Sequence, residues 1–311
     1  MTDASLRAGA VVVAFALDRL FGEPPPRVHP VVWMGKALGA SGAPWPRLAP
    51  WSQFLCGAAA WLAGGGAVLA AAALAVALMR RLPQFPPWTL LVQMLLLGIL
   101  LKPLQAWRML RDEVTGVERA LATGLEEGRQ RLSRLVSRDT RRLSAGEVRE
   151  SALESLAENL NDSLVAPLFW FTLGGLPAAA LYRFANTADA MWGYRDRWEW
   201  AGKWAARTDD LLSYLPARLT ALLLAIAGRR SPRGLGAVAR LTPSPNGGWP
   251  MGMLALALGV RLGKPGVYAL NAAGPEPGAT HTARAIGICT RAAWLAVAAS
   301  AAVLALLGWR S

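Results

Sequence analysis

The strongest constraint on this fold is a series of long apolar segments that carry almost no charge. The clearest is residues 54–79, which are rich in Ala, Leu and Gly and contain no charged side chain. About 20 apolar residues suffice for a helix to cross the hydrocarbon core of a bilayer. Similar segments are residues 88–101, 211–228 and 292–309, with weaker ones at 9–21 and 164–181. The sequence therefore predicts an all-α, polytopic integral membrane protein.

The polar segments between these runs indicate the domain organisation. We expect residues 1–311 to form a single membrane-embedded domain, with amphipathic helices and loops in polar blocks at about 102–163, 182–210 and 229–252. Within residues 102–150 of the first block, 11 basic residues outnumber 8 acidic ones, so the positive-inside tendency predicts that this region is cytoplasmic. The formal net charge of +13 fits the basic loops of a membrane protein better than nucleic-acid binding.

Local patterns in the first polar block predict two helical stretches. Apolar residues recur at helical spacing from Leu110 to Leu125, and the pattern is broken near Gly128. Ser144 and Glu147 have the spacing of a capping box, which predicts the start of a second helix.

An acidic line lies on that second helix, within residues 151–162. Glu154, Glu158 and Asp162 follow at i, i+4 and i+8, on one helical face. Like charges at this spacing repel, so the helix gains no stability from them. A carboxylate line just before an apolar run usually has a partner, such as a cation, a metal or a substrate. The alternatives are a solvated face that ends at the membrane, or a structural network with the basic residues of 138–149.

Polar residues elsewhere suggest further contributions to a site. Asp18 lies in an apolar stretch, where an acid is costly unless it serves a purpose. Arg218 follows Asp209 and Asp210 in an apolar segment, where it would face a carboxylate or an anionic ligand. The Gly/Pro-rich loop at 241–252 would let backbone amides approach a phosphate, although it lacks the P-loop pattern.

The motifs, taken in order, resemble the CobD/CbiB family of cobalamin biosynthesis. The matching stretches are spread over roughly residues 15–270, and their combination is far more specific than any one of them. They are LDRLFGEP (17–24), HPVVWMGKALG (29–39), SRDTRRL (137–143), ESLAENLNDSLVAPLFW (154–170), YRFANTADAMWGYRD (182–196), TDDLLSYLPARLTA (208–221) and SPNGGWPMG (244–252).

This resemblance implies adenosylcobinamide-phosphate synthase activity in a multi-pass protein of the bacterial cytoplasmic (inner) membrane. The family joins a free propionate carboxylate of adenosylcobyric acid to aminopropanol or its O-phosphate, forming an amide with ATP and Mg²⁺. The expected partners are these substrates, the lipid bilayer, other late enzymes of the pathway and further copies of the chain.

Amide formation from a carboxylate requires activation, for which an acyl phosphate made from ATP is the economical route. Such chemistry needs a divalent ion held by carboxylate and amide oxygens, and basic side chains that neutralise phosphoryl charge. The predicted metal ligands are Glu154, Glu158, Asn159 and Asp162. The predicted catalytic residues are Glu154, Glu158, Asp162 and Asp189. The predicted substrate and phosphate contacts are His29, Arg138, Asp139, Arg141, Arg183, Asn186, Arg195, Arg218 and Asn246.

Two other functional classes compete with the enzyme. A solute carrier would also use intramembrane acids and an arginine, but it would show an inverted repeat with paired broken helices, which the sequence lacks. An AmpE-like membrane scaffold or sensor without catalysis would be expected to have lost several acidic positions. Glu154, Glu158, Asp162, Asp189 and Asp209 are all present.

Overall fold

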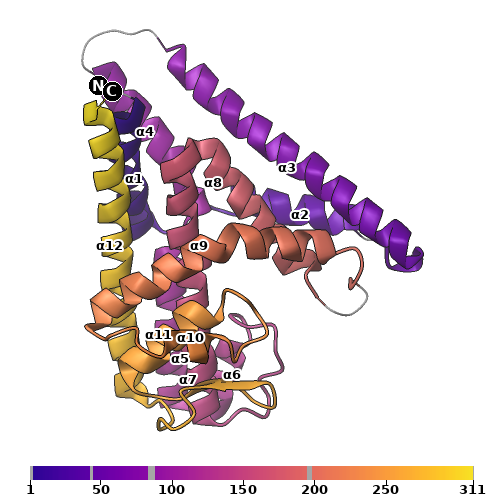
Figure 1. The fold of residues 1–311 in the computed structure, drawn as a ribbon, viewed down its shortest axis with the longest axis vertical. Coiled ribbons are helices and arrows are strands. Elements are labelled where there is room, and N and C mark those ends of the chain that lie inside the picture. Colours follow the sequence, from indigo (N-terminus) through magenta and orange to yellow (C-terminus); the bar gives the residue numbers. More distant parts are fainter. Residues whose placement is uncertain (1–2, 43–44, 83–87, 195–197, 311) are drawn as a thin grey trace. The chain divides into compact units, whose positions relative to one another are not determined.

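Helices dominate the protein and confirm the predicted all-α membrane architecture (Figure 1). The computed structural model describes residues 3–42, 45–82, 88–194 and 198–310. Its elements, in chain order, are α1 (Asp3–Phe21), α2 (Pro30–Gly42), η1 (Trp45–Arg47), α3 (Pro50–Arg80), α4 (Trp88–Leu101), η2 (Lys102–Leu104), α5 (Trp107–Thr123), α6 (Leu125–Leu132), α7 (Ala145–Leu160), the π-helical turn η3 (Asn161–Val165), α8 (Ala166–Trp192), α9 (Lys203–Gly228), α10 (Leu235–Ala239), α11 (Gly248–Leu258), β1 (Leu262–Lys264), β2 (Tyr268–Leu270) and α12 (Ala279–Arg310).

Five helical segments of the described chain are long and apolar enough to cross a membrane. They are Pro50–Arg80, Trp88–Thr123, Ala145–Trp192, Lys203–Gly228 and Ala279–Trp309. They contain five of the predicted apolar segments. The sixth, residues 9–21, forms most of α1 and is not among these five. The chain is therefore a multi-pass membrane protein.

The chain packs as two compact units, each assembled from segments that are distant in sequence. The first comprises Met1–Ala106, Ala166–Leu212 and Val297–Ser311, and the second comprises Trp107–Val165 and Ser213–Ala296. Helices α9 and α12 contribute to both units. The acidic segment 151–162 belongs to the second unit.

In the first unit, α1 lies along α4, and α2 and α3 pack against α8 (Figure 1). Tryptophans fill part of this core: Trp45 and Trp192 meet edge to face with ring centroids 4.9 Å apart. Trp192 is only 1% exposed. The role of Trp192 is therefore packing.

Helix α8 is broken at Gly174 and Gly175. Gly175 has φ 67° and ψ −159°, a backbone region that is essentially restricted to glycine. Pro177 follows within the first turn of the next helical stretch, a position where its missing N–H costs no hydrogen bond. Two glycines and a proline thus explain why a long apolar run is not one straight helix.

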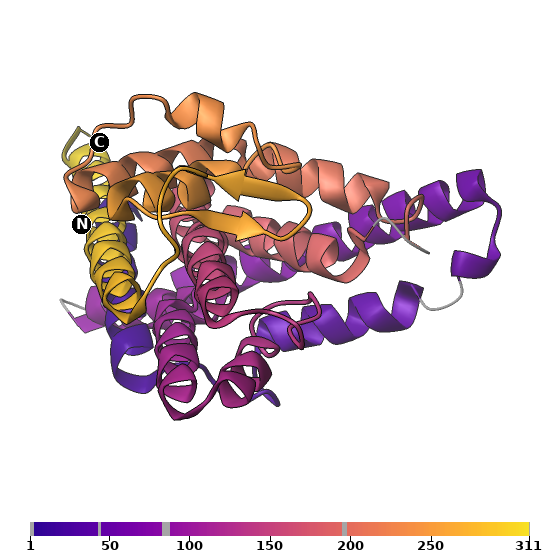
Figure 2. The same cartoon turned by 90° about the horizontal axis from the view of Figure 1, so that it is seen from below.

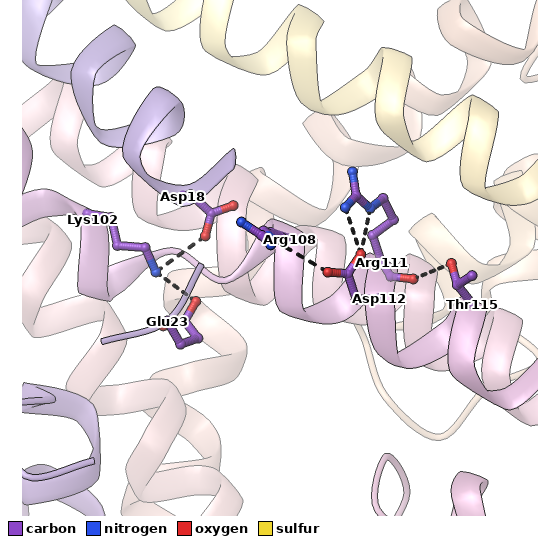
Figure 3. A network of polar contacts seen from close by, with 7 residues as sticks. All are labelled: Asp18, Glu23, Lys102, Arg108, Arg111, Asp112 and Thr115. Atoms are coloured by element: carbon purple, nitrogen blue, oxygen red, sulfur yellow. Dashed lines mark hydrogen bonds and ion pairs between the residues drawn. The ribbon is translucent and has the colours of Figure 1, made fainter. Parts of the chain in front are cut away.

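A buried ionic cluster joins α1 and the loop after it to η2, directly after α4 (Figure 3). Lys102 Nζ lies 3.3 Å from Asp18 Oδ1 and donates to Glu23 Oε1 at 2.8 Å. The Asp18 side chain is 0% exposed and that of Lys102 is 7% exposed. His29 Nδ1 accepts from the Val31 amide at 3.2 Å, so the neutral ring carries its proton on Nε2, which lies 2.9 Å from Glu23 Oε2. The buried acid predicted at Asp18 therefore has a cationic partner.

The pKa of Glu23 reflects the balance of forces in this cluster. Burial alone would raise the pKa of this carboxyl, but hydrogen bonds from His29 and Lys102 and the positive charge of Lys102 lower it below its ordinary value. Glu23 is therefore ionised at neutral pH.

In the second unit, α7 packs against α5, α6, α11 and β1. The predicted capping box is confirmed: Glu147 N donates to Ser144 Oγ at 3.2 Å, and Ser144 N donates to Glu147 Oε2 at 2.7 Å. The predicted break near Gly128 is wrong, because the chain turns at Gly124, between α5 and α6. Gly128 lies inside α6, where a Cβ would collide with Leu121.

A short antiparallel hairpin completes this unit. Strands β1 and β2 pair Lys264 with Tyr268 around a turn in which Gly266 has φ 71° (Figure 2). On α5, Arg108 and Arg111 form exposed pairs with Asp112 (Figure 3).

Replacing Lys102 with Met is expected to destabilise the protein by about 3–5 kcal/mol, because two buried carboxylates would lose their cation. Thermal unfolding in detergent measures this loss. Lys36→Met removes an exposed lysine of α2 and should leave the transition in place. Adding Asp18→Asn to Lys102→Met should recover part of the loss. An unchanged transition in Lys102→Met would show that the cluster adds no stability.

Candidate functional site

The candidate site is built on α7, a helix whose acidic residues point into the second unit. Glu154 is 2% exposed, and its Oε2 accepts a hydrogen bond of 3.1 Å from Arg138 Nη2. Arg138 Nη1 also donates to Ser151 Oγ, one turn earlier on α7, at 3.2 Å. A charge buried to this extent is tolerated only when it is paired. The Arg138–Glu154 pair therefore fixes the loop before α7 against the helix.

The second oxygen of Glu154 is less completely satisfied. Within the described residues, Glu154 Oε1 is buried and no donor contacts it with hydrogen-bond geometry. The Tyr268 hydroxyl interacts with this carboxylate, and Lys264 contributes a positive charge nearby. Both side chains come from the hairpin. A buried oxygen that retains hydrogen-bonding capacity is a natural point of contact for a ligand.

Burial and the negative charge of Glu154 together raise the pKa of Tyr268 above its ordinary value. The phenol therefore remains protonated throughout the neutral range. It is a hydrogen-bond donor at the site, since its one proton can go to a carboxylate or to a bound oxygen.

Glu158 lies one turn further along α7 and is half-buried. Its Oε1 approaches the loop before α11: a Cβ added to Gly247 would lie 3.0 Å from this oxygen. The negative charge of Glu158 also acts on Tyr268. The structure thus brings Glu154, Glu158, the hairpin and the 241–252 loop to one region of the unit.

The end of α7 departs from the regular helix that the sequence pattern predicts. Residues Asn161–Val165 form a π-helical turn, a feature often found at functional sites. Asn161 is held at both ends, because its Nδ2 donates to Asp162 Oδ1 at 2.8 Å and its Oδ1 accepts from Thr220 Oγ1 at 2.9 Å. Asp162 therefore does not continue the helical face that carries Glu154 and Glu158. Its carboxylate is oriented by the hydrogen bond from Asn161.

Arg218 contacts the 241–252 loop. Its Nη1 donates to Asn246 Oδ1 at 3.1 Å, and its guanidinium stacks on the Tyr214 ring with the central carbon 3.4 Å from the centroid. The Trp249 ring lies further away, at 4.7 Å. A planar guanidinium suits such stacking and leaves N–H groups for an anion.

The amides of this loop are used within the loop. Ser244 Oγ accepts from Asn246 N at 3.2 Å and from Gly247 N at 3.0 Å. Gly248 is required for close packing, because a Cβ there would collide with the Ala239 carbonyl. In this conformation, the loop offers a phosphate the Arg218 side chain rather than the amides of Asn246 and Gly247.

Two other predicted residues of this unit form a surface pair. Arg141 Nη2 lies 2.8 Å from Asp139 Oδ2, and the Arg141 side chain is 84% exposed. The Arg141 guanidinium holds the pKa of Asp139 well below its usual range. Asp139 is therefore ionised at neutral pH. The hydrogen bonds described for it are all with Arg141, two residues away.

The remaining predicted residues belong to the first unit. Arg183 Nη1 donates to Asn186 Oδ1 at 3.1 Å on α8, and Asp189 lies one turn further along that helix. His29 belongs to the buried cluster with Glu23 and Lys102. Arg195 lies outside the described residues.

The donor set allows a specific test of the predicted metal site. Among the described residues, no three His, Cys, Asp or Glu side chains are close enough to hold an ion by themselves. Asn159 Nδ2 donates to Ser155 O at 3.0 Å on its own helix. Mg²⁺ commonly takes one or two carboxylates and completes its shell with water and phosphate oxygens. The residues thus fit an ion shared with a phosphate ligand, with Glu154 Oε1 and Glu158 as donors, rather than an all-protein cage.

Sequence reasoning missed the hairpin residues Lys264 and Tyr268. A signal was present, since Pro265-Gly266 is a turn dipeptide between short apolar stretches. It also missed Lys102 as the partner of Asp18 and Thr220 as the partner of Asn161, for which no local pattern exists.

The fold and the site define a polytopic α-helical membrane protein in which one helix presents acidic residues flanked by arginines. The family model described as CobD/Cbib protein matches residues 11–303. The chain therefore belongs to the CobD/CbiB family.

The chain is similar along most of its length to several proteins of this family. It is 40% identical over 299 residues to the "Probable cobalamin biosynthesis protein CobD" of Thermococcus kodakarensis, covering 95% of this chain and 94% of the relative. It is 41% identical over 288 residues to the "Cobalamin biosynthesis protein CobD" of Brucella suis, covering 86% and 85%. For the protein of that name from Rhodobacter capsulatus, the identity is 38% over 305 residues, covering 92% and 93%. No solved structure matches the chain.

The raised pKa of Tyr268 yields a direct test of the site geometry. In folded protein, wild type and Tyr268→Phe should gain the same phenolate absorbance on titration through about pH 10, the ordinary phenol pKa, because Tyr268 remains protonated there. After unfolding in denaturant, wild type should show one additional phenolate. A difference between the two folded proteins near pH 10 would mean that burial and Glu154 do not protect this phenol.

Proposed function

We propose that this chain is an ATP-dependent amide synthase of cobalamin biosynthesis in the bacterial cytoplasmic membrane. It would join the free propionate carboxylate of adenosylcobyric acid to aminopropanol or aminopropanol phosphate, giving adenosylcobinamide or its phosphate. The observation that carries the proposal is the location of family motifs. The stretches 137–143, 154–170, 208–221 and 244–252 supply Arg138, Glu154, Glu158, Arg218 and Asn246, which contact one another or lie in neighbouring parts of one unit.

The reaction consists of two balanced steps. A propionate oxygen attacks the γ-phosphorus of ATP, the bond from that phosphorus to the bridging oxygen breaks, and ADP leaves. The amine nitrogen then attacks the carbonyl carbon of the acyl phosphate, inorganic phosphate leaves, and the nitrogen loses a proton. Both steps develop negative charge on phosphate oxygens, so the catalytic need is for positioned cations and a proton acceptor.

The two arginines supply positive charge at different parts of the site. Arg218 presents its guanidinium beside the loop, stacked on Tyr214, which keeps its plane fixed while N–H groups remain for a phosphate. Arg138 neutralises Glu154, so that a phosphate can approach the helix without meeting an uncompensated buried charge. The protonated Tyr268 hydroxyl adds a neutral donor.

The carboxylates provide the remaining functions. Glu154 and Glu158, with Asp162 and Asn159 as further candidates, would hold a magnesium ion that neutralises phosphate charge when bound. Asp162 is oriented by Asn161 and is half-buried, which suits an acceptor for the amine proton.

The decisive assay uses the purified full chain in detergent with adenosylcobyric acid, aminopropanol phosphate, ATP and Mg²⁺. The corrin product is followed by mass, and the nucleotide product is identified as ADP or AMP. An amide product with equimolar ADP would support the proposal. Absence of both amide formation and nucleotide turnover would contradict the proposal and leave a membrane scaffold or a solute carrier as the function. AMP would contradict the acyl phosphate step.

Glu158→Gln and Asp162→Asn are each expected to lower amide formation by about 100-fold or more, because each removes a negative charge that the proposed reaction uses. Both substitutions preserve side-chain size, and unchanged thermal unfolding would show that the fold is intact. Glu127→Gln is a matched control, since Glu127 is an exposed carboxylate of α6 in the same unit. Rates within twofold of wild type for either site variant would remove that residue from the mechanism.

A further inference from the structure

A second ionic group lies in the first unit, away from the Lys102 cluster. Asp3 Oδ1 accepts from Arg80 Nη2 at 2.9 Å, and Asp3 Oδ2 lies 3.4 Å from Arg7 Nε. This group joins the start of α1 to the end of α3, two elements that are far apart in sequence. One carboxylate shared by two guanidinium groups leaves a net charge of +1.

These residues form the polar rim of a cavity of about 280 Å³. Its wall is apolar and is supplied by Ala73, Val76, Ala77, Met79, Leu97 and Leu176. Asp3 and Arg80 are 52% and 60% exposed, so the charged edge faces outward. The cavity is thus amphipathic, with a cationic entrance and a hydrocarbon-like interior.

The broken part of α8 forms another side of the cavity. Gly174, Gly175 and Pro177 line it, and a Cβ on Gly175 would lie 3.8 Å from Arg7 Nη1. The helical stretch that restarts here directs its positive dipole end towards the cavity. Within the described residues, Arg7 Nε is buried and its ion pair with Asp3 at 3.4 Å is not a hydrogen bond. A donor that is incompletely satisfied and a helix start both favour an anion.

The depth of the cavity in the unit matches the level of lipid headgroups. Helix α3 (Pro50–Arg80) is one of the five segments long and apolar enough to cross a membrane, and Arg80 is its last residue. The cavity lining includes Ala73, Val76, Ala77 and Met79, all from the last turns of this helix. Basic residues at the ends of membrane-crossing helices lie at the level of the lipid headgroups, so the cavity lies at such an interface.

We propose that this cavity binds an anionic phospholipid, with the phosphate contacting Arg7 and Arg80 and the first part of an acyl chain lying on the apolar wall. The charges agree, since a phosphodiester carries one negative charge and the ionic group carries one net positive charge. Basic pockets between transmembrane helices bind lipid headgroups by this chemistry. The lipid would fill the cavity lined by α1, α3 and the broken part of α8.

Native mass spectrometry of the delipidated full chain tests this proposal, with phosphatidylglycerol and phosphatidylcholine as probes. Wild type should retain phosphatidylglycerol preferentially. Arg80→Gln should weaken retention about fivefold, the effect of losing one basic residue at a membrane surface, and adding Arg7→Gln should weaken it further. Asp3→Asn should strengthen retention, because the competing carboxylate is gone; a purely structural role for the ionic group would not give this gain.

Arg81→Gln is the matched control, because Arg81 is exposed, adjacent to Arg80 and absent from the cavity lining. It should retain lipid as wild type does. Equal retention by wild type and Arg80→Gln, or equal losses in Arg80→Gln and Arg81→Gln, would overturn the proposal. Displacement of the lipid by millimolar glycerol phosphate would also overturn it, since it would indicate a site for a soluble phosphate without an acyl chain.

Discussion

The candidate site depends on keeping a carboxylate charged although its side chain is almost completely buried. Glu154 is 2% exposed, and its cost is offset by Arg138 in the preceding loop and by the hairpin that carries Lys264 and Tyr268. Each of these elements is irregular or short and would have little stability by itself. The buried charge of Glu154 is therefore stable only when the loop and the hairpin are in place. In turn, its contacts hold the loop and the hairpin against α7.

Local signals in the sequence predicted those elements whose causes are local. The capping box at Ser144 and Glu147, the bounds of α4 and the long apolar segment within α3 follow from spacing and composition, and the structure confirms them. The break predicted near Gly128 was wrong because glycine serves there for close packing of α6 on α5, a tertiary reason that a sequence pattern does not reveal.

The site itself was predictable only as a set of residue types. The acidic residues of α7 and the arginines were identified from motifs, and the contacts Arg138–Glu154 and Arg218–Asn246 show which of them meet. Two further hydrogen-bond donors of the site were not predicted. Tyr268 is 114 residues from its partner Glu154, and Thr220 is 59 residues from its partner Asn161, so no local sequence pattern links them. Long-range pairing of this kind is decided by packing, which is why the sequence reading could not supply it.

The π-helical turn at Asn161–Val165 has a consequence for insertions and deletions in this helix. A π turn accommodates one more residue than an α turn over nearly the same rotation. Loss of one residue from this stretch would give an ordinary α-helix and keep the later apolar residues close to their present phase. Such a shortened chain could fold and enter the membrane, yet Asp162 would lose the displacement that sets it apart from the helix face. Length variation at this turn would thus separate the capacity to fold from the capacity to function.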